Sequence, residues 1–293
     1  MPAQQIAQNL AYINWTVLVA LGIGTFAALV VARERTDAPR GYLVFTALCA
    51  AGFAGLAWLS DSALPGAAGS AAGGAAGAAG AAVTARHVAP DPLFDQARAA
   101  GLAILAISAL VWAIAVRRGM PHTRLPAISG LAGGGLTLAA AAGGWGGGIV
   151  AGLLLLLQLA VLSAASGGVF AAMILGHWYL VSPKLGERPL VLLSRLLFWT
   201  LGIQLVLYGA WVATGVGTGT SPFSALSGPW ALFVWLRLIV GLLFPLVVSW
   251  AAIQTARSRS MESATGLLYI NVGTIAAGTI LAAGLYFGAG LLT

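Results

Sequence analysis

Long runs of apolar residues, separated by short polar stretches, dominate this chain. A helix that crosses a bilayer needs about 20 such residues. The sequence therefore predicts eight transmembrane helices, at residues 13–32, 41–60, 99–116, 125–143, 148–177, 189–215, 230–255 and 264–291. Pro245 lies inside the seventh run, where it should kink or locally open the helix because proline has no backbone N–H to donate.

The composition favours an all-α polytopic membrane bundle, with residues 1–293 forming a single integral membrane domain. Hydrophobic residues make up 60% of the chain and charged residues only 7%, whereas a soluble domain has about 25% charged residues. A surface this poor in charge suits lipid rather than water. The net charge of +7 looks at first like a nucleic-acid signal, but the basic residues gather at the ends of the apolar runs. We therefore expect the lipid bilayer as a partner, and no nucleic acid.

The basic residues also predict an orientation. Ten of them fall on one side of the predicted bundle, in four short loops: Arg33, Arg35, Arg40, Arg117, Arg118, Arg124, Lys184, Arg188, Arg257 and Arg259. The other side has only Arg86 and Arg98, both in the one long loop, residues 61–98. Short basic loops face the cytoplasm. We therefore expect a multi-pass protein of the cell (inner) membrane with both termini outside the cytoplasm, and a flexible, Gly/Ala-rich extracytoplasmic loop at 61–98.

A short repeated string suggests an internal duplication. Residues 24–30 read GTFAALV and residues 168–174 read GVFAAMI, four predicted helices apart and running in the same direction. This spacing predicts two four-helix halves with parallel topology, although short apolar strings also match by chance. In outline, two such halves resemble the eight-helix anchors of polysulfide-reductase-type oxidoreductases. That resemblance is one of architecture and rests on no motif.

Polar residues at membrane depth are the candidates for ligand binding. None of the eight predicted segments contains Asp or Glu, which argues against a carboxylate relay. Arg237 lies about 10 Å below the outer end of the seventh helix, and Gln204 and Tyr208 lie at a similar depth in the sixth. Together these three could hydrogen-bond a quinone carbonyl or a lipid headgroup. The alternatives for Arg237 are snorkelling to the outer face, an ion pair with Asp61 or an acid of the long loop, and a subunit contact.

His177 and Trp178 lie at the inner end of the fifth helix. His177 could bond a quinone carbonyl or ligate the iron of a heme shared with another subunit, because imidazole serves as both metal ligand and hydrogen-bonding group. The alternative is an interfacial anchor beside Trp178, in an aromatic belt. His177 is the one histidine near a predicted membrane helix, so this chain alone cannot supply two histidines to one heme. We predict no catalytic residue, no metal ligand and no cofactor held by this chain alone.

These features favour a membrane subunit of an electron-transfer or other energy-transducing complex, such as a respiratory chain. Such a subunit would anchor membrane or peripheral partner subunits, could shape a quinone pocket, and would not be catalytic on its own. Two alternatives stay open. One is a transporter of a small uncharged or anionic solute, which Arg237 and Pro245 favour. The other is a lipid-modifying membrane enzyme, for which the sequence lacks an evident acidic or metal-binding cluster.

Overall fold

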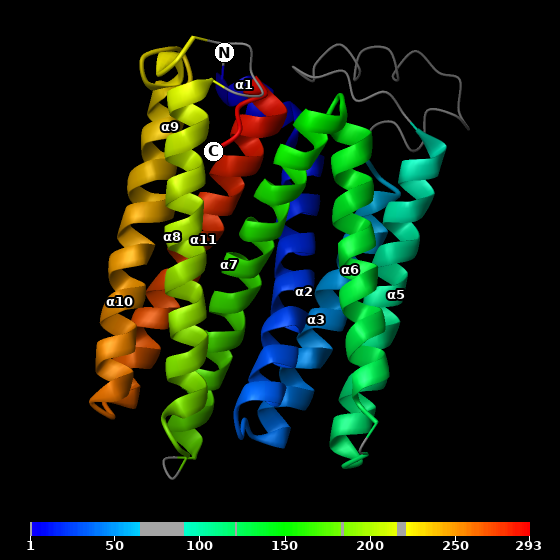
Figure 1. The fold of residues 1–293 in the computed structure, drawn as a ribbon, viewed down its shortest axis with the longest axis vertical. Helices are drawn as coiled ribbons and strands as arrows, with labels where there is room; N and C mark the ends of the chain where they lie inside the picture. Colours follow the sequence, from blue (N-terminus) through cyan, green and yellow to red (C-terminus); the bar gives the residue numbers. More distant parts are fainter. Residues whose placement is uncertain (1, 65–90, 121, 183–184, 216–220) are drawn as a thin grey trace.

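The computed structural model describes residues 2–64, 91–120, 122–182, 185–215 and 221–293. Within them, eight helical segments are long and apolar enough to cross a membrane, which confirms the predicted all-α membrane bundle (Figure 1). They are α2 (Leu10–Arg35), α3 (Arg40–Asp61), α5 (Pro92–Arg117), α6 (Arg124–Trp145), α7 (Ile149–Val181), α8 (Arg188–Thr214), the segment Ala231–Arg257, and α11 (Met261–Ala289). A short helix that was not predicted, α1 (Pro2–Gln8), precedes them.

The seventh span is interrupted near its middle. It consists of α9 (Ala231–Leu238), a π-helical turn η2 (Ile239–Leu243) and α10 (Phe244–Arg257). A single 3-10 turn, η1 (Ser224–Leu226), comes before α9. Pro245 lies in the first turn of α10, so the local opening expected around this residue takes the form of the π turn.

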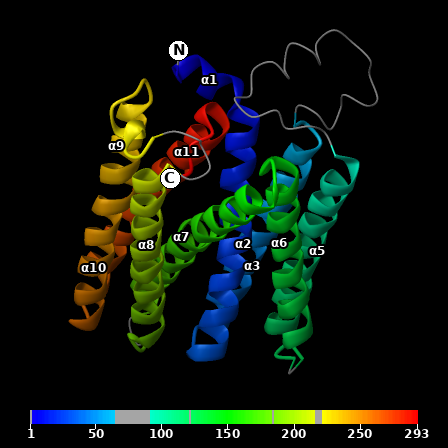
Figure 2. The ribbon, with the colours of Figure 1, turned by 45° about the horizontal axis from the view of Figure 1, so that its top comes forward.

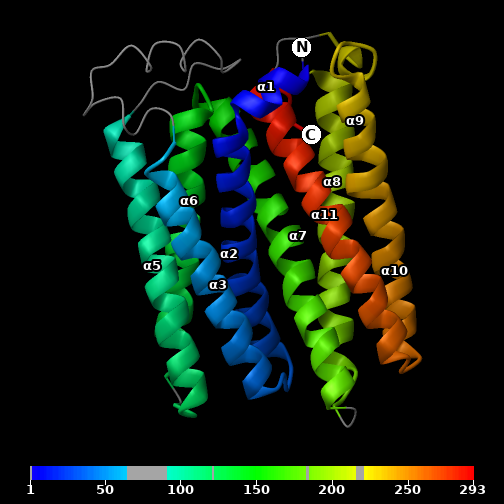
Figure 3. The ribbon, with the colours of Figure 1, turned by 180° about the vertical axis from the view of Figure 1, so that it is seen from behind.

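Both chain termini lie at the same end of the bundle, which we call the terminal end (Figures 1 and 3). At the opposite end, the basic end, α2 ends at Arg35, α3 begins at Arg40, α8 begins at Arg188 and α10 ends at Arg257. The predicted gathering of the short basic loops at one end is therefore present. Lys184, Arg86 and the Gly/Ala-rich part of the 61–98 loop lie outside the described residues.

The helices pack as two four-helix units that lie side by side (Figure 2). In the first unit, α2, α3, α5 and α6 each pack against the next helix in the chain, and in the second unit α7, α8, α10 and α11 do the same. The main contact between the units joins α2 to α7, the first helix of each. This is the arrangement that a tandem duplication with parallel topology produces.

Glycines bring α2 and α7 into backbone contact. A Cβ atom added to Gly24 would overlap the carbonyl oxygen of Ser163, and one added to Gly167 would overlap the backbone of Thr25. The Thr25 hydroxyl donates a hydrogen bond to the Gly167 carbonyl across the crossing, at 3.4 Å. Gly24 opens the first copy of the repeated string and Gly167 immediately precedes the second copy, so nearly equivalent positions of the two units meet here.

The third span begins earlier than its hydropathy indicates. α5 begins at Pro92, with Asp91 capping the helix by accepting a hydrogen bond from the backbone N–H of Leu93 at 2.9 Å. Asp95 and Arg98 are therefore helical, and Asp61 is the last residue of α3. The predictions that Arg98 lies in a loop and that no acid lies inside a spanning helix were wrong, because a hydropathy window discards the polar turns at both ends of a helix.

Candidate functional site

Arg237 is buried inside the second unit, with 2% of its surface exposed. Its Nη2 donates a hydrogen bond to Oε1 of Gln204 on α8 at 3.0 Å. Gln204 is held in turn by its Nε2, which donates to the Val161 carbonyl on α7 at 2.7 Å. The structure thus brings together two of the predicted ligand-binding residues. Snorkelling of Arg237 to the outer face and its pairing with Asp61 were wrong predictions, because the guanidinium points into the unit.

The π turn supplies a second partner for Arg237. Its Nη1 donates to the Gly241 carbonyl at 3.2 Å. In a regular α-helix that carbonyl would accept from the N–H of residue 245, which is a proline here and has none. The amide just before this proline, Phe244 N–H, bonds to the Ile239 carbonyl five residues back, as in a π-helix. The arginine therefore donates to a carbonyl that Pro245 cannot reach with a backbone N–H.

Close approach of α11 completes the surroundings of Arg237. A Cβ added to Gly241 would lie 2.7 Å from Cα of Gly278, and one added to Gly278 would lie 2.8 Å from the Arg237 Nη1. Glycine at both positions leaves the space that the guanidinium occupies. Tyr208, the third predicted member of the pocket, lies one turn beyond Gln204 on α8, and its hydroxyl donates to the Val234 carbonyl on α9 at 3.1 Å.

The charge of Arg237 has only neutral partners within the part of the chain that the structure describes. None of the described carboxylates comes within 4.0 Å of its guanidinium. Its Nε is buried and has no hydrogen-bond partner there either. A buried cation is costly in lipid unless something compensates it, so this is the most unusual electrostatic feature among the predicted site residues.

A second buried arginine, Arg98, lies in the first unit and was missed by sequence reasoning. It is 1% exposed, and its Nε and Nη2 contact the two carboxylate oxygens of Asp61 at 2.5 and 3.3 Å. Its Nη1 forms an ion pair with Asp95 at 3.0 Å. The guanidinium lies over two indole rings, 4.8 Å from the ring centroid of Trp145 and 5.7 Å from that of Trp15. The charge of Arg98 is therefore compensated by two carboxylates and two aromatic faces.

The two arginines occupy corresponding places in the two units. Each lies near the terminal end of the third span of its unit and binds a polar residue of the second span, Asp61 or Gln204. About one turn further along, each third span meets the fourth at a pair of glycines, Gly101 with Gly133 and Gly241 with Gly278. The difference is the partner: a carboxylate in the first unit and a neutral amide in the second.

His177 and Trp178 do not join this site. They lie near the end of α7 at the basic end of the bundle, whereas Arg237 lies near the terminal end. His177 is exposed, with its Nδ1 3.4 Å from the Tyr269 hydroxyl on α11. Trp178 is half-buried and its ring packs on Gly41, where an added Cβ would lie 2.6 Å away. A shared site for these two residues and Arg237 would need a ligand long enough to span much of the bundle.

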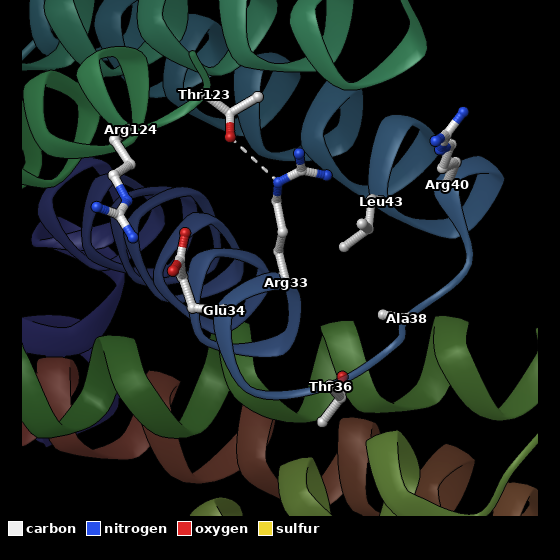
Figure 4. A pocket seen from close by; sticks show the side chains of 8 residues that line it. All are labelled: Arg33, Glu34, Thr36, Ala38, Arg40, Leu43, Thr123 and Arg124. Atoms are coloured by element: carbon white, nitrogen blue, oxygen red, sulfur yellow. Dashed lines mark hydrogen bonds between the residues drawn. The ribbon is translucent and has the colours of Figure 1, made fainter. Parts of the chain in front are cut away.

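The basic end contains two clefts rich in arginine. One has a volume of about 390 Å³ and is lined by Arg33, Glu34, Thr36, Ala38, Arg40, Leu43, Thr123 and Arg124 (Figure 4). In it, the Arg33 Nε donates to the Thr123 hydroxyl at 3.2 Å, and the Glu34 carboxylate points toward Arg124. The other has a volume of about 610 Å³ and is lined by Arg35, Thr36, Glu187, Arg188, Val191, Leu192, Arg195 and Arg257.

Comparison of the chain with protein-family models, with curated proteins and with solved structures found no significant match. Across the described ranges, no three or more His, Cys, Asp and Glu side chains are grouped so that they could hold a metal ion.

Proposed function

We propose that this chain is a membrane subunit of an electron-transfer or other energy-transducing complex, and that its second unit binds a carbonyl-bearing or anionic small molecule, with a quinone as the first candidate. In this proposal Arg237 donates hydrogen bonds to a ligand oxygen, Gln204 holds the guanidinium in place, and Tyr208 closes the terminal side. Redox cofactors would belong to partner subunits anchored by the bundle.

One observation carries the proposal: the buried charge of Arg237 lacks the carboxylates that its counterpart Arg98 has. Ionisable residues inside a membrane protein mark ligand or ion sites by default, and π turns are frequent at functional sites. An oxygen of a quinone or an anion would give the guanidinium a stronger acceptor than the neutral amide and backbone carbonyl that it contacts now. Arg98, by contrast, has a structural role in this proposal, because carboxylates already compensate its charge.

The proposal includes an orientation. The short basic loops would face the cytoplasm and the termini would lie outside it, in the cell membrane, by the positive-inside rule. The Arg237 site would then lie at the depth of the extracytoplasmic leaflet, in the half of the membrane nearer the chain termini.

Purification of the full chain from native membranes tests the assembly. Co-purification with cytochrome, flavin or iron–sulfur subunits is expected. A lone monomer or homodimer that carries no redox partner would contradict the membrane-subunit proposal.

A pair of substitutions tests the ligand site separately. Gln204→Glu places a carboxylate beside Arg237, as Asp61 lies beside Arg98, and this internal counter-ion should compete with a ligand oxygen. We expect it to lower affinity for a ubiquinone or menaquinone analogue by about tenfold or more while preserving the fold, since charge-assisted hydrogen bonds contribute about 1.5–3 kcal/mol. Arg118→Gln, an exposed arginine at the basic end, is the control. Equal quinone affinity in Gln204→Glu and the control would exclude Arg237 as the site.

Transport of a small anionic solute is the second candidate, and the contact between the units favours it. The backbones of the two units meet at Gly24 and Gly167, and the seventh span is interrupted beside the buried cation. Uptake of small organic anions into vesicles that contain only this chain distinguishes the two proposals. Uptake that Gln204→Glu abolishes would favour the transporter over the membrane subunit.

A further inference from the structure

The larger cleft at the basic end lies between the two units. α2 of the first unit supplies Arg35 and Thr36, α8 of the second unit supplies Arg188 and Arg195 together with Glu187 just before it, and α10 supplies Arg257. A volume of about 610 Å³ is large enough for a phosphate-containing headgroup. The cleft is far from Arg237 and serves no step of the function proposed above.

The arginines of this cleft have no carboxylate partner within the described parts of the chain. Arg35, Arg188, Arg195 and Arg257 form no ion pair there. Glu187, the one acid among the lining residues, has its carboxylate 3.6 Å from the Nε of Arg259, which does not line the cleft. Four like charges around one cavity repel one another, and an anion between them would relieve that repulsion.

The lining has a polar and an apolar part. Arg188 lies at the first residue of α8, whereas Arg195 lies about 10 Å further along the helix axis, and Val191 and Leu192 lie between them. A free phosphate ion would use the arginines only. A phospholipid would place its phosphate among the guanidinium groups and its glycerol and upper acyl chains against the two aliphatic side chains.

The positive-inside rule explains why arginines are at this end of the bundle, but it does not explain why four of them line one cleft. Topology requires basic residues in short loops, and Arg117 and Arg118 at the end of α5 satisfy that requirement while lining neither cleft. Arg195 is two turns inside α8 rather than in a loop, yet its side chain lines the same cavity as Arg35 and Arg257.

We propose that this cleft binds the headgroup of an anionic phospholipid. Basic pockets between transmembrane helices on one side of a membrane are recurrent sites for anionic headgroups, and Arg is the side chain best suited to bidentate contact with phosphate. A bound lipid bridges α2 to α8 and α10, and so joins the two units at the end opposite their Trp145 and Tyr286 contact.

The test is lipid binding by the full chain in a neutral detergent, measured by native mass spectrometry during titration with phosphatidylglycerol, phosphatidylcholine or inorganic phosphate. Phosphatidylglycerol should bind at least about tenfold more tightly than phosphatidylcholine. Inorganic phosphate should compete only weakly, because it cannot use Val191 and Leu192. Equal binding of the two lipids would overturn the proposal, and inorganic phosphate that binds as tightly as phosphatidylglycerol would show a site for the free ion instead.

Matched double variants identify the site. Arg195→Gln with Arg257→Gln should lower phosphatidylglycerol affinity by about tenfold or more, because each basic residue near an anionic surface contributes substantially to the attraction. Arg117→Gln with Arg118→Gln removes the same net charge from the same end and should leave the affinity within about twofold. The single variant Arg188→Gln, also at an exposed position, should show an intermediate loss. Equal losses in the two double variants would mean that the lipid responds to overall charge, and would exclude the cleft.

Discussion

Arg237 supplies the hydrogen bond that Pro245 cannot, by donating from Nη1 to the Gly241 carbonyl at 3.2 Å. An interior proline normally leaves the carbonyl four residues back without its donor. Here the side chain of Arg237, one turn earlier in the helix, donates a hydrogen bond to that carbonyl instead. The buried cation and the interrupted helix are thus parts of one arrangement, and the stabilities of the two positions should depend on each other.

A double-mutant cycle on these positions measures that dependence. Arg237→Met removes the side-chain donor to Gly241, while Pro245→Ala adds a backbone donor to it. We expect Pro245→Ala to be more favourable, by about 1 kcal/mol, in the Arg237→Met background than in the wild type, since a membrane hydrogen bond contributes about 0.6–2 kcal/mol. Denaturant unfolding in mixed micelles gives the four free energies. If the free-energy changes of the two substitutions simply add, the Arg237 side chain and the amide of residue 245 do not compete for the Gly241 carbonyl.

The two carboxylates beside Arg98 should contribute unequally to stability. Asp61 keeps 6% of its side-chain surface exposed and contacts the guanidinium with both oxygens, whereas Asp95 keeps 28% of its side-chain surface exposed. Asp61→Asn should lower the free energy of unfolding by about 3–5 kcal/mol, because it leaves a buried cation poorly compensated. Asp95→Asn should cost about 1 kcal/mol or less, because water reaches its carboxylate and Asp61 still compensates the arginine. Thermal unfolding in detergent ranks the two, and similar losses would refute this division of roles.

Adjacent glycines on α7 provide a test of the crossing between the units. Gly167→Ala should force α2 and α7 apart, because the added methyl group would overlap the backbone of Gly24 and Thr25 rather than a movable side chain. A cost of about 1–3 kcal/mol is expected, as for overpacking in a core. Gly168→Ala is the matched control, since an added Cβ there meets no atom within 4 Å, and alanine favours the helix by about 1 kcal/mol over glycine. The two variants should therefore change stability in opposite directions.

The proposed orientation can be tested with single cysteines, because the chain has one native cysteine, Cys49, which can be replaced by serine. Ser62 follows α3 at the terminal end and Ser258 follows α10 at the basic end, and both are exposed. In intact cells a membrane-impermeant maleimide should label Ser62→Cys, and it should label Ser258→Cys only after permeabilisation. The reverse pattern would invert the assignment that rests on the positive-inside rule.

Hydropathy predicts the eight spans of this chain closely, because the cost of burying polar groups in lipid acts on every residue of a segment. It fails at the start of α5, where Asp95 and Arg98 lie inside a helix. There the favourable pairing with Asp61 offsets the polarity, and that partner lies across a long Gly/Ala-rich segment. A local signal was present nevertheless: Asp91 followed by Pro92 is the usual beginning of a helix, with a capping residue and a proline in the first turn.

The Arg237 site was partly predictable. The depth of Arg237, Gln204 and Tyr208 in neighbouring spans indicated that they could lie close together, and Arg237 does contact Gln204. The use of the Gly241 carbonyl could not be foreseen, because it depends on the π turn and on the close approach of α11 at Gly278. The correspondence between Arg98 and Arg237 was hidden by the incorrect placement of Arg98 in a loop.

An uncompensated charge part-way into a bilayer also makes a site electrically sensitive. Arg98 is neutralised within its own unit and Arg237 is not, so a ligand that neutralises Arg237 must bring its negative charge through part of the membrane potential. A full crossing corresponds to about 2.3 kcal/mol per elementary charge per 100 mV, and entry to Arg237 corresponds to a fraction of that. The affinity of an anion for this site would therefore change with voltage, whereas that of an uncharged quinone would not.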